Sequence, residues 1–177
     1  GQRHDIEVES PLAIHLGISI SRGERMDWVI QKATELGVTH VSPLLTERTE
    51  VKLKADRAEK KRQHWQQIAI SACEQCGRNR LPVINPLTLL PKWLNDSQAE
   101  LKLVLHHRAE NLSAQSTPPR SIDLLIGPEG GLSPDEIHLA EQRAFRALRL
   151  GDRVLRTETA PLAALSILQA RWGDMAP

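Results

Sequence analysis

Apolar and polar positions along this chain follow two periods, one typical of strands and one typical of helices. The stretch 12–20 alternates as a strand does. A helix is predicted after it, because apolar residues recur at helical spacing: Met26, Val29, Ile30, Ala33 and Leu36. The same reasoning predicts strands at 40–45, 101–105, 122–126 and 147–150, and helices at 55–76, 91–98, 134–144 and 161–172. Strands alternating with helices predict an α/β fold: a mostly parallel sheet with helices on both faces.

Local signals fix several boundaries. Ser133 is predicted to cap a helix, with Pro134 first inside and Glu136 completing a capping box. Thr159 is predicted to cap the last helix in the same way. Segments 82–90 and 108–120 contain prolines and are predicted to be mostly extended or loop. The long helix at 55–76 is expected to bury one stripe: Trp65, Ile68, Ala69 and Ala72.

Composition narrows the class of protein. The length of 177 residues suits one domain, and 40% apolar residues suffice for a core. The net charge is only +1, but Lys and Arg outnumber Asp and Glu from Arg48 to Arg62. This basic run is either a solvated helix face or a set of phosphate contacts. Aromatic residues are few, so stacking platforms for single-stranded RNA are scarce. No apolar run is long enough to span a membrane, so no membrane partner is expected.

The two cysteines, Cys73 and Cys76, are spaced as C-x-x-C. A zinc site would need two further ligands at similar spacing, and a redox motif would sit between a strand and a helix. Both cysteines fall instead near the end of a predicted helix. We therefore expect two reduced thiols, no metal and a cytoplasmic protein.

Three polar or glycine-rich segments follow predicted strands in the last third of the chain. They are Leu105-His106-His107, the loop Gly127-Pro128-Glu129-Gly130-Gly131, and the segment 150–160, which holds arginines, acidic residues and threonines. Ligands of open α/β sheets bind beyond the carboxyl ends of the strands, so these segments are expected to form one site. The glycine loop matches neither a dinucleotide-binding nor a P-loop motif, and a plain turn remains its alternative.

These residues also carry a resemblance. GPEGGLS followed by LGDRVLRTETAPLAAL resembles the carboxyl-terminal signature of the SPOUT methyltransferases, and ERMDWVIQKATELGVTHVSPLLTERTEV and ACEQCGR extend it upstream. More narrowly, the chain is similar to the bacterial family that methylates N3 of a uridine in 16S ribosomal RNA (small-subunit methyltransferase E). The resemblance covers about residues 12–172, without the β-barrel domain that precedes it in the family.

The resemblance implies a methyltransferase domain at 12–177, a deep trefoil knot within about 101–172, and a lead-in at 1–11 from a missing amino-terminal barrel. It also implies a homodimer, the cofactor S-adenosylmethionine, and 16S ribosomal RNA of the small ribosomal subunit as partner. General topology rules would argue against a knot. By family analogy the cofactor is lined by Leu105, His106, Gly127, Pro128, Glu129, Gly130, Leu150, Gly151, Leu155, Arg156, Thr159 and Ala160.

Methylation at N3 of uracil requires loss of a proton, so a base or a stabilising cation is expected beside the acceptor. The candidate bases are Glu74, Glu129 and Glu158, with His106 and His107 as weaker ones; the candidate cations are Arg25, Arg78, Arg153 and Arg156. Arg156 is the favoured site arginine. Each has a plainer alternative: Glu129 as a helix cap, Glu74 paired with Arg78 on its helix, Arg156 in an ordinary ion pair. Phosphate contacts are expected at Arg22, Arg25, Arg48, Lys52 and Lys54.

Other functions remain open at this stage. The first is a sibling enzyme of the same fold that methylates a ribose 2′-hydroxyl, and the second is an RNA-binding module without catalysis. A small-nucleotide hydrolase is disfavoured, because the sequence offers no nucleophile with a paired base and no metal cluster.

Overall fold

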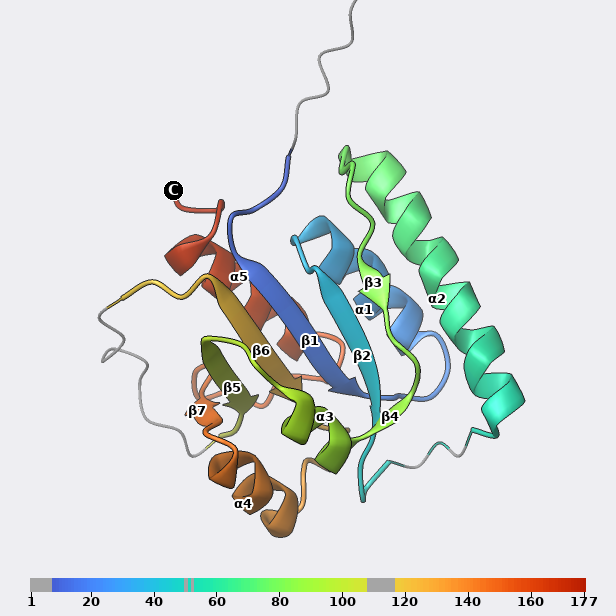
Figure 1. Ribbon diagram of the computed structural model, residues 1–177, viewed down its shortest axis with the longest axis vertical. Helices are drawn as coiled ribbons and strands as arrows, with labels where there is room; N and C mark the ends of the chain where they lie inside the picture. The colour runs from blue at the N-terminus through green and yellow to red at the C-terminus, as the bar shows by residue number, and fades with distance from the viewer. Residues whose placement is uncertain (1–7, 50, 52, 108–116) are drawn as a thin grey trace, which may run out of the picture.

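A computed structural model describes residues 8–49, 51, 53–107 and 117–177 of the chain. The described residues form a parallel α/β domain (Figure 1). Its strands are β1 (Ala13–Ser19), β2 (His40–Leu45), β3 (Val83–Ile84), β4 (Thr88–Leu89), β5 (Leu101–Leu105), β6 (Ser121–Ile126) and β7 (Arg146–Leu148). Its helices are α1 (Arg25–Glu35), α2 (Ala55–Cys76), α3 (Leu90–Asp96), α4 (Pro134–Gln142) and α5 (Ala160–Trp172).

The strands form one seven-stranded sheet in the order β3-β2-β1-β6-β5-β7, with β4 also paired to β2. Every pairing is parallel. Strand β1 lies in the centre, where Leu16 is opposite Val41 of β2 and Leu124 of β6. Parallel strands need crossover connections, and helices α1, α2, α3 and α4 lie in four of the connections between strands. The carboxyl ends of β5, β6 and β7 therefore meet at the same edge of the sheet.

Each face of the sheet has its own apolar core. Helices α1, α2 and α5 cover one face, where Ile14, Leu16 and Leu124 are fully buried with Leu165 of α5. Helices α3 and α4 cover part of the other face, where Trp93 packs with Phe145 (Figure 1). Burying both faces of a parallel sheet explains why its strands are almost continuously apolar.

Glycine at position 17 allows α3 to approach the sheet. A Cβ atom at Gly17 would lie 2.5 Å from the Trp93 ring, closer than real contacts allow. The indole of Trp93 thus occupies the space that a larger side chain at position 17 would need.

The predicted elements are confirmed with small changes in their bounds. The capping box at Ser133 is present, because its hydroxyl accepts from the Glu136 amide at 3.1 Å while the Glu136 carboxylate accepts from the Ser133 amide at 3.0 Å. The cap predicted for the last helix is wrong in one respect: Thr159 occupies the N-cap position, but its side chain makes no capping hydrogen bond. In the predicted buried stripe of α2, Ile68 is only partly buried. The trefoil knot stays a prediction.

None of the helices that the structure describes is both long and apolar enough to cross a membrane. The basic surplus of α2 lies largely on an exposed face, where Arg62 pairs with Glu59 one turn away. This part of the charge run is therefore a solvated helix face.

Candidate active site

The three segments singled out after predicted strands line one cavity of about 580 Å³ at the carboxyl edge of the sheet. Leu105 ends β5 and is followed by His106 and His107, Ile126 ends β6 and is followed by the loop 127–132, and residues 149–155 follow β7. Ala160, the first residue of α5, closes it. The expectation that these connections form a single site is confirmed by this convergence.

Local geometry shapes the glycine loop. The Gly131 amide donates to the Pro128 carbonyl at 2.8 Å, and Gly131 has a φ of +78°, which side-chain-bearing residues rarely adopt. A Cβ at Gly127 would approach Leu132 to within 2.7 Å. The loop is therefore a fixed turn whose main chain forms the cavity wall.

An arginine from a distant element completes this wall. The Arg48 guanidinium donates from Nη1 to the Gly130 carbonyl at 2.9 Å, and Arg48 itself lines the cavity. The sequence prediction treated Arg48 only as an RNA contact. Arg48 and Gly130 are 82 residues apart in the chain, so no local sequence pattern predicts this contact.

All predicted cofactor residues line the cavity except Arg156 and Thr159, whose side chains are exposed. The Arg156 carbonyl instead accepts from the amides of Thr159 and Ala160, at 3.0 Å each, at the start of α5. The structure therefore does not support Arg156 as the site arginine of this cavity. Sequence reasoning gave no place in this cavity to Ile126, Leu132, Ile137 and Arg149, and it placed Arg48 only at the RNA.

An acidic pair with a bound arginine lies beside the cavity. The Arg25 guanidinium contacts the Glu129 carboxylate directly, and its Nε lies 3.9 Å from Glu158 Oε2. Two of the three candidate bases and one candidate cation thus come together from the first turn of α1, the glycine loop and the segment before α5. Glu129 does not cap α4, because Ser133 and Glu136 do so.

Two further cavities adjoin the first. One of about 860 Å³ is lined by Arg22, Arg25, Trp28, Glu158 and neighbouring residues, and one of about 160 Å³ lies between Arg22 and Arg48. Glu129 lines all three cavities, and no other described residue does. Its carboxylate therefore stands where the three spaces meet.

The other predicted catalytic pair, Glu74 and Arg78, lies elsewhere. Arg78 is buried near the amino ends of the strands, where its Nε and Nη2 each donate to Glu9 at 2.9 Å. Its Nη1 donates to the carbonyls of Thr34 and Val38, at 2.8 and 3.0 Å. The expected pairing of Glu74 with Arg78 is wrong: the guanidinium joins the end of α1 to the segment before β1. Neither side chain lines the cavities described above.

The predicted phosphate contacts divide into three groups. Arg22, Arg25 and Arg48 line adjoining cavities at one edge of the sheet. Lys54 is exposed at the N-cap of α2. Lys52 lies outside the described residues.

Cys73 and Cys76 are free cysteines, and burial raises the pKa of the Cys73 thiol. Within the described residues, no group of three His, Cys, Asp or Glu side chains is placed to hold a metal ion.

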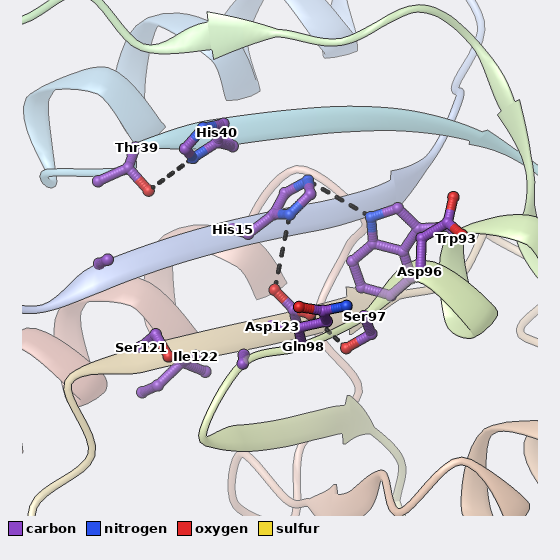
Figure 2. A pocket seen from close by; sticks show the side chains of 12 residues that line it. His15, Thr39, His40, Trp93, Asp96, Ser97, Gln98, Ser121, Ile122 and Asp123 are labelled. Atoms are coloured by element: carbon purple, nitrogen blue, oxygen red, sulfur yellow. Dashed lines mark hydrogen bonds and ion pairs between the residues drawn. The ribbon is translucent and has the colours of Figure 1, made fainter.

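A separate polar cavity of about 320 Å³ opens on the sheet face that α3 covers (Figure 2). His15 lies at its centre: Nδ1 is 3.5 Å from Asp123 Oδ1, while Nε2 is 2.6 Å from Ser42 Oγ and 3.4 Å from the Trp93 indole nitrogen. Asp123 also accepts a hydrogen bond from Ser97. Burial lowers the pKa of His15 to about 4, against the opposing effect of Asp123.

Ser42, His15 and Asp123 contact one another in the spatial order of a serine-hydrolase triad. The surroundings of Ser42, however, are not those of a catalytic serine. Ser42 is only 2% exposed and accepts a hydrogen bond from the Asn85 amide at 3.0 Å. A nucleophile must reach its substrate, and this hydroxyl is covered. These contacts instead tie α3 to three neighbouring strands, so we interpret them as a structural network.

Comparison with known proteins gives a consistent result. Residues 8–169 match the family model of an RNA methyltransferase domain. A ribosomal RNA small subunit methyltransferase E of Buchnera aphidicola (subsp. Schizaphis graminum) is 43% identical over 171 residues, covering 95% of this chain and 69% of that protein. Its Bacillus subtilis namesake is 35% identical over 170 residues, covering 90% of this chain and 66% of that protein. The chain thus spans about two thirds of the length of these relatives.

Solved structures agree with this comparison. A methyltransferase of Legionella pneumophila, in complex with the bound cofactor SAM, superposes with a TM-score of 0.92 at 46% identity, covering 96% of this chain and 70% of that one. A ribosomal RNA small subunit methyltransferase E of Neisseria gonorrhoeae, bound to S-adenosyl methionine, gives 0.89 at 44% identity, with 96% and 71% covered.

Proposed function

The chain belongs to the RNA methyltransferase domain family, and we propose that it transfers a methyl group from S-adenosylmethionine to N3 of a uridine in 16S ribosomal RNA. Its relatives are named as methyltransferases of small-subunit ribosomal RNA, which supports the substrate class. The observation that carries the proposal is the joining of three strand-end connections into one cavity, with Glu129 at its boundary.

The cavity suits the cofactor in size and chemistry. Its volume of about 580 Å³ lies within the range of roughly 300–1,000 Å³ typical of small-molecule sites. Apolar side chains suited to a purine ring line it: Leu105, Ile126, Leu132, Ile137, Leu150 and Leu155. The glycine loop lacks bulky side chains at positions 127, 130 and 131, so a ligand can approach its main chain closely. Polar and charged side chains for its amino-acid end include His106, Asp152 and Arg153.

Two requirements follow from the chemistry of N3. The nitrogen lies on the pairing edge of uracil, so the base must be unpaired or turned out of its helix. When bound, the cofactor supplies a sulfonium methyl group: N3 bonds to the methyl carbon, the carbon–sulfur bond breaks with its electrons on sulfur, and the N3 proton must leave. A proton acceptor beside the cavity is therefore needed.

Glu129 is the residue that we propose for this proton. It is half exposed and lines both the cofactor cavity and the larger cavity next to it. Arg25 contacts its carboxylate and limits the directions in which it can turn. Glu158 is farther from Arg25 and does not line the cofactor cavity, so we propose a supporting role for it. The proposal includes a homodimer, as the resemblance implies.

Cofactor binding is tested by isothermal titration of the protein with S-adenosylmethionine. A leucine at position 130 would add bulk at the cavity wall, where a Cβ already lies 3.6 Å from Arg48. Gly130→Leu should weaken binding at least about tenfold, a change of about 1.4 kcal/mol. Ala55→Leu adds the same kind of bulk at an exposed position of α2 and should leave binding unchanged. Absence of binding to the parent protein would refute the cofactor assignment.

The acceptor atom is tested by mass analysis of nucleosides from small ribosomal subunits methylated in vitro. We expect N3-methyluridine, whereas a 2′-O-methylated nucleoside would refute the N3 assignment. Glu129→Gln should lower kcat by about 10²–10⁴, the usual contribution of a general base. Glu158→Gln is the matched control and should have a smaller effect. A loss of less than about tenfold in Glu129→Gln would exclude Glu129 as the base.

A further inference from the structure

A tryptophan forms part of the larger cavity beside the cofactor site. Trp28 of α1 lines the space of about 860 Å³ together with Arg25, Glu129 and Glu158. Its exposure of 49% is unusual for this chain, because Trp65 and Trp93 are 4% and 6% exposed and Trp172 packs against the core. An indole of this exposure beside an acid–arginine cluster is suited to contact a ligand rather than to fill a core.

We propose that this cavity receives the acceptor base of the RNA and that the Trp28 indole stacks against it. This inference rests on the proposed function, because it places the substrate of that reaction. Every nucleobase presents an apolar π face, and stacking on an aromatic side chain holds it without reading its edge. The edge stays available for the transfer at N3.

The surroundings of Trp28 favour RNA over an apolar ligand. The Lys32 ammonium lies 4.9 Å from the centroid of the indole, one turn farther along α1. Arg22 and Arg25 line the same cavity. Cations placed around an exposed aromatic ring are typical of single-stranded nucleic-acid sites, where they contact phosphates while the ring contacts a base.

The position relative to Glu129 links the stack to the chemistry. Glu129 is shared by this cavity and the cofactor cavity. A base held by Trp28 would therefore have the carboxylates of Glu129 and Glu158 in the same open cavity. Trp28 is then a positioning residue for the acceptor and makes no contribution to cofactor binding, because it does not line the cofactor cavity.

The test compares Trp28→Ala with Trp28→Phe, using steady-state methylation of small ribosomal subunits and cofactor titration. Trp28→Ala should raise KM for the RNA by about 5- to 150-fold, which corresponds to ~1–3 kcal/mol per stacked base. Trp28→Phe keeps a stacking face and should recover most of this loss. Leu81→Ala removes a comparably exposed apolar side chain, 45% exposed, away from the cavity and should change nothing. Uridine oligonucleotides should quench the fluorescence of the parent protein more than that of Trp28→Phe.

The outcomes separate the two proposals. If the parent protein binds the cofactor and methylates RNA, but Trp28→Ala keeps KM within twofold, the stacking role is overturned and the proposed function stands. If Trp28→Ala changes the oligomeric state in size-exclusion chromatography, Trp28 is covered by a second copy of the chain and the inference also fails. If the parent protein binds no cofactor, the proposed function itself is refuted.

Discussion

Acid should destabilise this domain through His15, more strongly than through its exposed histidines. Burial lowers the pKa of His15 to about 4 from its ordinary 6.5; His40 also lowers it, and Asp123 opposes both. In the neutral ring, Nε2 accepts from the Ser42 hydroxyl and the Trp93 indole, while Nδ1 carries its proton toward Asp123. Protonation would place a second N–H against the Trp93 N–H, so the folded state disfavours it.

The sign and size of the effect follow from these two pKa values. The unfolded chain binds this proton more readily than the folded chain, so the contribution to stability is complete above pH 6.5 and is lost as the pH falls toward 4. The difference of 6.5 minus about 4 is about 2.5 pH units, at about 1.4 kcal/mol each. The free energy of unfolding should therefore fall by about 3 kcal/mol on account of this group alone.

Urea unfolding followed by circular dichroism at a series of pH values measures this loss. Other groups titrate in the same range, so the informative quantity is the difference between the parent protein and His15→Gln, which cannot titrate there. His138→Gln, at an exposed histidine of α4, should keep the parental pH dependence. Parallel curves for the parent protein and His15→Gln, or a His15 pKa near 6.5 by NMR titration, would refute the reasoning.

Three further substitutions test the fold. Arg78→Met removes a buried guanidinium and leaves its carboxylate partner unpaired, so the free energy of unfolding, measured in urea, should fall by about 3–5 kcal/mol. Arg120→Met breaks an ion pair at the surface and should lower it by less than about 1 kcal/mol. Gly17→Ala forces a methyl group against the Trp93 ring and should lower the free energy of unfolding by about 1–3 kcal/mol, measured by thermal unfolding. An unchanged melting temperature would show that α3 moves freely. Ser133→Ala removes the helix cap and should lower the unfolding free energy by about 1 kcal/mol, and no loss would mean that solvent replaces the cap.

Much of the cavity that we propose for the cofactor could be predicted from sequence, because the signals for it are local. The glycine loop lies within a few residues of a buried strand and a capped helix, and parallel topology places the ends of such strands at one edge. Leu105, Gly127 and Leu155 were named for this reason and line the cavity. Arg156 was named by its neighbours in sequence, but it is exposed and does not line the cavity that they form.

The amino-acid sequence by itself determined the α/β class, the helix and strand positions and the cap at Ser133. Each of these depends on periodicity or on groups within one turn of the chain, which local sequence encodes directly. Only the tertiary structure decided that Arg25 meets Glu129 and Glu158, that Arg78 binds Glu9, and that Trp28 faces a cavity. These contacts join residues far apart in the chain, and they depend on β1 lying between β2 and β6, an order of strands that no local preference specifies.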